Sequence, residues 1–427
     1  MHQDAADAPF PVEDCRRQFP SIETAGRFIF FDNAAGAQVP AGVLEAVADH
    51  LLARNVQRGA PYRRSREVDA TIGRARESAA AFVNARSADE IAFGLNATSF
   101  IRAISLAVGH TIDDGRSEIV LTELDHEANV ATWLALERFG ARIRWWHVRD
   151  DGRLHAEDLA PLLNQRTRLV ACTVASNATG SVVDVSDVAR RAHGVGAEVF
   201  LDAVHYAPHG SIDVQRFDCD YLVCSGYKIF APHMGFAWCR REAINALPTF
   251  REHFIPDVTP DKLETGTYGY ESVAGFDAAV RYLEDLGRRF TWDADYRASR
   301  SETLRRTMER IAQYEQTLSA KLLDEIGGID GVTVHGMADR ERLSDRLPTL
   351  AFTVAGIPAS VISEGLAARD VGVRSGHMYS PRLIERLGLL PNGVVRASLV
   401  HYNTAAEIDR FRDALIEVIE AANISRP

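Results

Sequence analysis

Short apolar runs alternate with amphipathic segments from about residue 28 to residue 240 of the 427-residue chain. The apolar runs predict strands at residues 90–95, 118–122, 142–148, 168–174, 198–201, 221–224 and 235–239. The amphipathic segments predict helices at residues 43–55, 97–108, 128–139 and 185–193. Strands that alternate with helices form βαβ units, so the pattern indicates an α/β fold with a mostly parallel, seven-stranded sheet.

The second half of the chain follows a different pattern. Residues 283–310 are charged and helix-prone, and this character continues to about residue 326, which predicts a long connector between two domains. Residues 332–419 carry fewer and more widely spaced strand signals, which indicates a smaller α/β domain. We expect a large domain over residues 20–285 and a small domain over residues 286–427, completed by residues 1–19. The polar stretch 55–66 predicts a loop beside the functional site.

Charge and cysteine content narrow the functional classes. The net charge of −11 argues against nucleic acid or an anionic membrane surface as a partner. No apolar run reaches the ~18 residues that a membrane span needs, and the acidic start of the chain does not resemble a secretory signal. The five cysteines lie without metal-binding spacing, and an odd number favours reduced thiols. We therefore expect a cytoplasmic protein without a metal site.

Lys228 and Asp202 each follow a predicted strand. Ligands of open α/β sheets bind in the crevice at the carboxyl ends of the strands, so both side chains are expected there. An amine and a carboxylate in that place suit pyridoxal 5'-phosphate (PLP). The lysine would form a Schiff base with it, and the aspartate would keep its pyridine nitrogen protonated. A surface lysine and a capping aspartate would give the same local pattern.

Seven ordered motifs extend this reading over nearly the whole chain. They are FFDNAA (30–35), DHEAN (125–129), SNATG (176–180), DAVH (202–205), SGYK (225–228), ETGT (264–267) and VRASLVHYNT (395–404). With these motifs the chain resembles the class V aminotransferase family, and within it the Suf-type cysteine desulfurases and their desulfurase-like relatives. The resemblance implies a PLP-dependent transferase of fold type I, with a large domain and a smaller C-terminal α/β domain.

The resemblance also implies which residues hold the cofactor phosphate. Residues 94–99 follow a strand and open a helix, whose free amides and positive dipole end can receive an anion. The family match places the phosphate at the backbone of Ala97 and at Thr98, with further hydroxyl donors from Ser225 and Tyr227. Thr267 matches a residue that reaches the phosphate of the partner subunit, which implies a homodimer with shared active sites. Helix capping is the ordinary alternative for such Ser and Thr residues.

Three more residues are matched to the cofactor ring. His126 would stack on the ring and relay protons, although an ordinary structural histidine is the alternative. His205 stands where the desulfurases have a glutamine that bonds the phenolic oxygen. Asn177 would lie beside the ring or the substrate carboxylate.

An amino-acid substrate is implied by the C-terminal motifs. Arg396 matches the guanidinium that clamps the α-carboxylate by a bidentate pair. Arg374 and His377 fall on the substrate loop of the family, which is mobile there. A surface salt bridge is the alternative for the two arginines.

The resemblance breaks at Tyr379, which stands where a desulfurase carries its nucleophilic cysteine. No cysteine follows Cys239, and a phenol cannot accept sulfur as a persulfide. We therefore expect a C–S β-lyase that performs β-elimination on a cysteine S-conjugate, with Tyr379 or His377 as a proton donor. Transamination, epimerisation and decarboxylation of an amino acid remain alternatives, whereas cysteine desulfuration is disfavoured. A non-catalytic PLP-binding protein is the alternative of another class.

Overall fold

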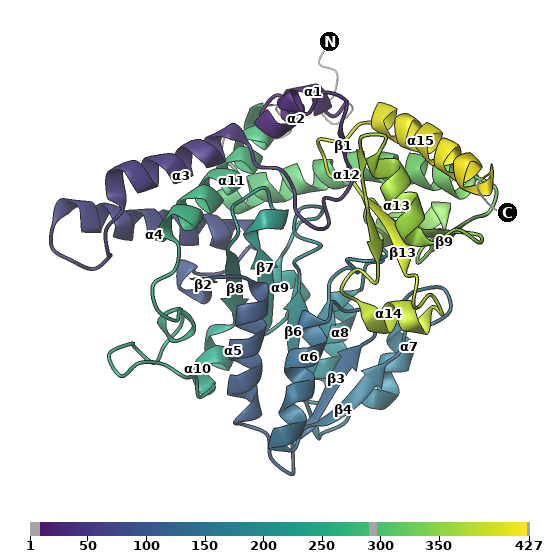
Figure 1. Ribbon diagram of the computed structural model, residues 1–427. Coiled ribbons are helices and arrows are strands. Elements are labelled where there is room, and N and C mark those ends of the chain that lie inside the picture. The colour runs from purple at the N-terminus through teal and green to yellow at the C-terminus, as the bar shows by residue number, and fades with distance from the viewer. Residues whose placement is uncertain (1–8, 290–296, 425–427) are drawn as a thin grey trace.

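All seven predicted strands form one sheet in the computed structural model, which describes residues 9–289 and 297–424 (Figure 1). They are β2 (Ile91–Gly94), β3 (Glu118–Thr122), β4 (Arg142–Trp146), β5 (Thr167–Thr173), β6 (Glu198–Asp202), β7 (Tyr221–Ser225) and β8 (Gly235–Cys239). Their order is β2-β8-β7-β6-β5-β3-β4. β8 runs antiparallel to β2 and β7, and the other neighbours are parallel. The mostly parallel sheet is confirmed.

The sheet is covered on both faces, which explains its continuous apolar strands. In β5, Val170 and Cys172 join one apolar core, whereas Leu169 and Ala171 join another on the opposite face. Helices α5 (Ala97–Gly109) and α6 (Ala128–Leu134) pack on one face of the sheet and α8 (Val185–His193) on the other (Figure 1). The shorter helices α7 (Ala156–Leu159), α9 (Val214–Phe217) and α10 (Arg241–Ala246) complete this layer arrangement.

The helix predictions are confirmed in part. The predicted helices at 43–55, 97–108 and 185–193 correspond to α3 (Ala41–Arg54), α5 and α8, and the one at 128–139 ends as a 3₁₀ turn after Leu134. Helix α4 (Arg63–Phe82) was not predicted, and it shortens the expected loop 55–66. The connector predicted at 283–326 is mostly helical over its described residues, and its role as a link between domains stays a prediction. It consists of the end of α11 (Tyr270–Arg289) and of α12 (Arg300–Gly327), while residues 290–296 lie outside the described residues.

A second, smaller sheet forms from the C-terminal part. Its antiparallel order is β12 (Arg374–Gly376), β13 (Val394–Ser398), β10 (Thr349–Val354) and β9 (Val332–His335). Its core includes residues of α12, α13 (Ala359–Ala367) and α15 (Ala405–Ile424). The helix α14 (Pro381–Arg386) follows β12.

The N-terminal part of the chain reaches this smaller sheet. The strand β1 (Ile29–Phe30) pairs in parallel with β11 (Val371–Gly372). Ile29 and Phe31 are buried in the same core as β10 and β13. Two short helices, α1 (Val12–Arg16) and α2 (Pro20–Thr24), precede β1. The domain limits at 20–285 and 286–427 stay a prediction.

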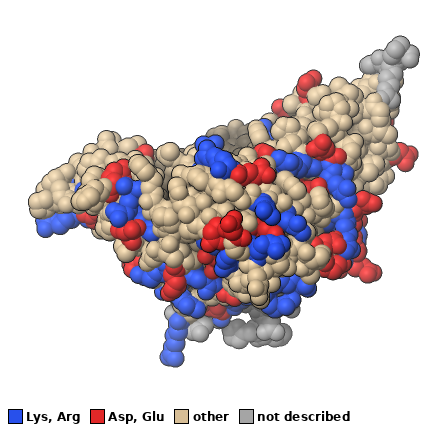
Figure 2. All heavy atoms as spheres, turned by 90° about the horizontal axis from the view of Figure 1, so that it is seen from below, with Lys and Arg blue, Asp and Glu red and all other residues tan. Residues whose placement is uncertain are grey.

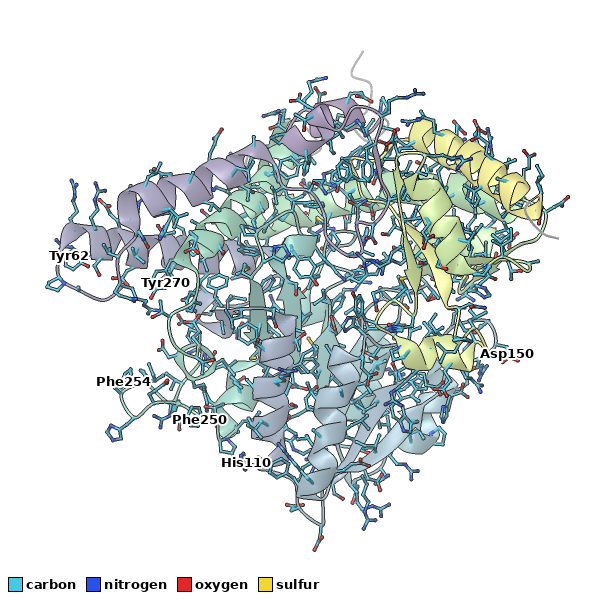
Figure 3. The ribbon with its side chains drawn as sticks, viewed as in Figure 1. Tyr62, His110, Asp150, Phe250, Phe254 and Tyr270 are labelled. Carbon is cyan, nitrogen blue, oxygen red and sulfur yellow. The ribbon has the colours of Figure 1, made fainter. Side chains whose placement is uncertain are left out.

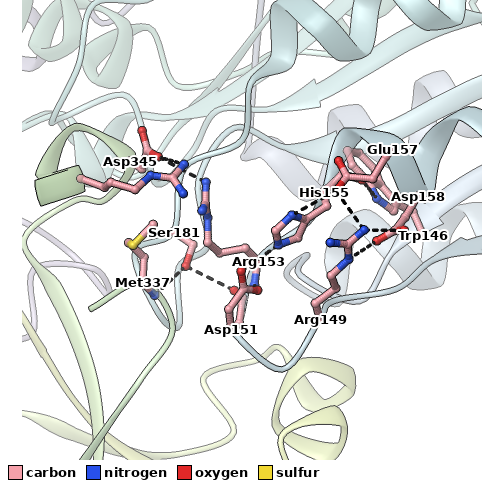
Figure 4. Close-up of polar contacts among 12 residues, drawn as sticks. Trp146, Arg149, Asp151, Arg153, His155, Glu157, Asp158, Ser181, Met337 and Asp345 are labelled. Carbon is pink, nitrogen blue, oxygen red and sulfur yellow. Dashed lines mark hydrogen bonds and ion pairs between the residues drawn. The ribbon is translucent and has the colours of Figure 1, made fainter. Parts of the chain in front are cut away.

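Polar contacts tie the two sheets together beside β4. Arg153, which follows β4, forms an ion pair of 3.2 Å with Asp345, which follows β9 (Figure 4). Within the larger domain, the Ser181 hydroxyl donates to the Gly152 carbonyl oxygen at 3.3 Å. The Met337 backbone N–H donates to the same hydroxyl at 3.4 Å. These contacts fix the smaller sheet over the edge of the larger one.

Charged side chains of both signs are interspersed over the face seen from below (Figure 2). In the described residues no helix is long and apolar enough to cross a membrane. Over the same ranges, no group of three or more His, Cys, Asp or Glu side chains is placed to hold a metal ion.

Candidate active site

Nine of the ten predicted cofactor residues line one cavity at the carboxyl ends of β5, β6 and β7. The cavity has a volume of about 430 Å³. β4 lies on one side of β3 in the sheet, whereas β5 and β6 lie on the other side. The order in which strands are added to the sheet therefore reverses beside this site, and open α/β sheets bind ligands at such a point. The nine residues are Ala97, Thr98, His126, Asn177, Asp202, His205, Ser225, Tyr227 and Lys228. The structure thus brings them together, while their individual roles stay predictions.

Lys228 brings an unpaired amine into this cavity. Its side chain is buried in a 3₁₀ turn, residues Gly226–Lys228, directly after β7. No hydrogen bond or ion pair of its Nζ atom occurs within the described ranges. Burial and, to a smaller extent, the positive charge of Arg396 lower the pKa of Lys228 from 10.5 to about 8. A large share of the amine is therefore uncharged and nucleophilic at mildly alkaline pH.

Asp202 ends β6 and faces the same cavity. The backbone N–H of Val204 donates to its Oδ1 at 2.9 Å. Burial raises the pKa of Asp202, whereas this hydrogen bond and the charge of Lys228 lower it. A cation placed against the second oxygen would stabilise the carboxylate form, and a protonated pyridine nitrogen is such a cation.

The first turn of α5 forms an anion-binding end of the cavity. Asn96 caps the helix by accepting the Ser99 N–H at 2.9 Å, so the N–H groups of Ala97 and Thr98 are left for a ligand. Gly235 of β8 lets this turn approach the sheet, because a Cβ there would collide with the Asn96 backbone and lie 2.8 Å from the Ala97 nitrogen. The positive end of the α5 dipole and the free N–H groups of its first turn therefore lie at one end of the cavity.

The two cavity histidines are uncharged at neutral pH. Burial, with the charges of Lys228 and Arg396, lowers the pKa of His126 from 6.5 to about 4. Its Nδ1 accepts the Ala128 N–H at 3.0 Å, which fixes the ring at the start of α6. Burial also lowers the pKa of His205 well below its usual value. His205 Nε2 lies 3.1 Å from the Thr349 hydroxyl, while its buried Nδ1 has no hydrogen-bond partner in the described structure.

Arg396 and Arg374 meet beside the cavity on two neighbouring strands. They are opposite each other in the register of β12 and β13. Arg396 is 2 % exposed, and its Nη1 donates to the Asn177 carbonyl oxygen at 2.8 Å. Both guanidinium groups also bind one carboxylate, that of Asp32. Arg374 was predicted on the substrate loop. It lies instead in the strand β12, which is hydrogen-bonded to β13, and the loop that contains His377 follows this strand.

The loop after β12 is attached to the larger domain. The Asn177 amide donates to the Met378 carbonyl oxygen at 2.7 Å and accepts from the Ser380 hydroxyl at 3.0 Å. The Glu127 N–H donates to the Tyr379 carbonyl oxygen at 2.8 Å. The Met378 side chain is buried, and the ring of the half-exposed Tyr379 lies 5.7 Å from that of His126. The loop thus closes one side of the site, and the Asn177 side chain serves as its anchor.

Thr267 lies apart from the other predicted cofactor residues. It lines a separate hollow of about 1110 Å³ together with Gln57, Arg58, Phe254 and Tyr270. The predicted loop 55–66 therefore borders this second hollow rather than the cavity that holds Lys228.

Asp32 was not predicted as a site residue, although it is part of the FFDNAA motif. Its partners are 342 and 364 residues away in the sequence, so no local pattern reveals the contact. The sequence did offer one clue to this contact. Two arginines predicted at one site require a negative charge close by.

The donor set fits PLP. The amine of Lys228, the carboxylate of Asp202, the unpartnered Nδ1 of His205 and the α5 amides lie around one cavity. If PLP binds there, these groups would face its aldehyde, pyridine nitrogen, phenolic oxygen and phosphate, respectively.

Comparison with known proteins identifies the family of the chain. The family "Aminotransferase class-V" matches residues 29–305 and 301–411. The chain is 35 % identical to "Aminotransferase-like protein FGM3" of Gibberella zeae, covering 97 % of this chain and 100 % of the relative. It is 32 % identical to a probable cysteine desulfurase of Synechocystis sp., covering 96 % of both chains.

A solved structure shows the same fold. The apo cysteine desulfurase of Thermococcus onnurineus NA1 superposes with a TM-score of 0.85 at 25 % identity, over 97 % of this chain and 99 % of that one. PLP is the cofactor that this family uses, and fold type I is confirmed. The chain therefore belongs to the class V aminotransferase family of PLP-dependent enzymes.

Proposed function

We propose that this protein is a C–S β-lyase that cleaves a cysteine S-conjugate or a similar amino acid by β-elimination. The supporting observation is the absence of a usable thiol near Lys228. Tyr379 occupies the loop position discussed above, and all five cysteines are buried and line no part of the cavity. Burial raises the pKa of Cys172 in β5 and of Cys224 in β7 well above the usual value. Sulfur therefore has no protein acceptor and must leave with the substrate fragment.

PLP would be held by the residues already described, and it supplies an electron sink for the pair left when the α-proton is removed. Arg396, with Arg374 beside it, would bind the α-carboxylate of the substrate. The uncharged Nζ of Lys228 would take the α-proton, because it is the basic group inside the cavity. His126 would cover the ring face.

The leaving sulfur takes the electron pair of the C–S bond as a thiolate. Tyr379 and His377 are the candidate donors of a proton to it, from the loop that covers the site. Their rings lie 6.0 Å apart, and His377 Nδ1 accepts the Tyr379 N–H at 3.0 Å. The other product is aminoacrylate, which water converts to pyruvate and ammonia. No protein nucleophile is needed at any of these steps.

The proposal includes a homodimer with shared sites. Thr267 lines the second hollow, where the phosphate of a partner's cofactor would be received. Phe250 and Phe254, each 80 % exposed, lie at the same edge of the molecule as Tyr270 (Figure 3). Exposed aromatic side chains of this kind favour burial against another protein surface. Sedimentation of the holoenzyme as two chains would agree with this assembly, and a stable monomer with full activity would exclude it.

Cytoplasmic location is also part of the proposal. It is supported by five free cysteines, since thiols stay reduced in that compartment.

The experiment is a single turnover of the holoenzyme with a cysteine S-conjugate. Pyruvate, ammonia and free thiol in equal amounts are expected, without a persulfide on the protein. Pyridoxamine phosphate without pyruvate would establish transamination instead. Sulfur trapped on a cysteine would restore the desulfurase reading, and a cofactor spectrum that no amino acid perturbs would indicate a binding protein.

A further inference from the structure

One carboxylate bridges the two arginines of the substrate site. Asp32 Oδ1 lies 2.9 Å from Arg396 Nη2. Asp32 Oδ2 lies 2.8 Å from Arg374 Nη2 and 3.0 Å from Arg374 Nε. Two arginines and one aspartate leave a net charge of +1 at this place, which is the charge that a single carboxylate of a ligand would neutralise.

Rigid backbone contacts hold Asp32 in position. Asp32 forms a β-bridge with Ser398, the last residue of β13. The next residue, Asn33, donates from its amide to the Ser398 carbonyl oxygen at 2.9 Å and to Asn403 Oδ1 at 3.1 Å. Ala34 N–H donates to the Ser398 hydroxyl at 2.8 Å. The carboxylate is therefore a built part of the site and not a flexible surface group.

The bridge also relieves a repulsion within the sheet. Arg374 and Arg396 are directly opposite residues of an antiparallel pair, and like charges in that arrangement destabilise it. Asp32 neutralises Arg374 with three hydrogen bonds and contacts Arg396 with one. Arg396 keeps a buried Nε without a hydrogen-bond partner in the described structure, so it retains a donor for a ligand.

Two free arginines would suit a dicarboxylic amino acid, with one guanidinium for each carboxylate. Here Asp32 takes the second guanidinium and adds its own negative charge beside it. We propose that Asp32 is a specificity-determining residue, which restricts the site to amino acids whose side chain carries no negative charge. The proposal rests on the proposed function, in that the two arginines border the amino-acid site. A side-chain carboxylate would meet Asp32, and like-charge contacts disfavour binding.

The test compares two ligands that differ in one group. S-(carbamoylmethyl)cysteine and S-(carboxymethyl)cysteine have the same shape, but only the second carries a side-chain charge. Dissociation constants are measured by titrating the visible spectrum of the holoenzyme, which reports binding without C–S cleavage. The wild-type protein is expected to bind the amide at least ~10-fold more tightly than the acid. In Asp32→Asn the ratio should fall by at least ~10-fold, because Arg374 is released.

Two further variants keep the result decisive. Arg374→Gln in the Asp32→Asn background should restore the preference for the amide. If Asp32→Asn does not fold, Arg374→Gln alone should strengthen the preference, because it leaves Asp32 less neutralised. Asp409→Asn, on α15, is the control that should leave the ratio unchanged.

The outcomes separate this inference from the lyase proposal. An unchanged ratio in folded Asp32→Asn, or an unchanged ratio in Arg374→Gln, overturns the role of Asp32 even if pyruvate forms. A shifted ratio without pyruvate supports Asp32 and overturns the lyase instead. If neither ligand binds the wild-type protein, both proposals fail.

Discussion

Lys228 of the apoprotein is expected to titrate near pH 8, well below an ordinary lysine. The perturbation to be applied is pH, followed by removal of the charge at Arg396. Burial is the main cause of the low pKa, and the Arg396 charge adds to it, whereas Asp202 and Asp32 oppose both. Arg396→Gln should therefore raise the pKa of Lys228, and Asp32→Asn should lower it.

The size of the effect follows from the two pKa values. A pKa lowered from 10.5 to about 8 corresponds to about 3.4 kcal/mol, at about 1.36 kcal/mol per pH unit. At pH 8 about half of the Lys228 amine is then uncharged, compared with about 0.3 % of a lysine that titrates at its ordinary value. The unfolded state binds this proton more tightly than the native state. The native apoprotein should therefore gain stability as the pH rises from about 8 to about 10.5.

The assay is competitive acetylation of the apoprotein across the pH range, read peptide by peptide by mass spectrometry. The chain has three lysines, Lys228, Lys262 and Lys321, so the peptides are easily resolved. Lys321 is the internal reference, because ion pairs with Asp409 and Glu325 raise its pKa. A Lys228 midpoint near 10.5 would refute the reasoning, since it would mean that the amine is solvated or paired with an anion.

Three other predictions address the site. Lys228→Ala should abolish turnover and the cofactor attachment that borohydride fixes, as mass spectrometry can establish; normal turnover would contradict the whole site. Arg396→Ala should weaken amino-acid binding by about 2–5 kcal/mol in a spectral titration, with the spectrum of the bound cofactor unchanged. An unchanged dissociation constant would indicate that Arg374 binds the substrate carboxylate instead. Asn177→Ala should destabilise the closed loop by about 1–3 kcal/mol, because it leaves the Met378 carbonyl without its donor. Faster amide exchange at residues 376–380 but not in β6 is expected, and unchanged loop exchange would show that other contacts hold it.

The strands of the larger sheet were predictable because their burial is two-sided. Residues 168–174 and 221–224 are nearly continuous apolar runs, and such runs have few alternatives to a covered parallel strand. The position of Asp202 and Lys228 on one cavity followed from the same topology, since each comes shortly after an apolar run.

Helix α4 shows what the pattern cannot reveal. Its buried side includes small or polar residues, such as Ser65, Ala75 and Ser78, which carry little apolar signal. Its charge is balanced by distant partners: Arg76 forms an ion pair of 2.8 Å with Glu264, 188 residues away. The Asp32 bridge escaped prediction for the same reason, because only the folded chain brings those charges together.

The parallel pair β1–β11 and the Asp32 contacts have a consequence for synthesis of the chain. The cavity around Lys228 uses residues 97–228, whereas the carboxylate clamp needs Arg396, 168 residues later. At about 5–20 residues per second, translation of that interval takes about 8–34 s. The strand β1 must wait for β11, and Asp32 must wait for Arg374, Arg396 and Ser398, before they find their partners. A ribosome-bound chain can therefore present all the predicted cofactor residues of the cavity before Arg396 exists, and contacts of this sequence separation form slowly.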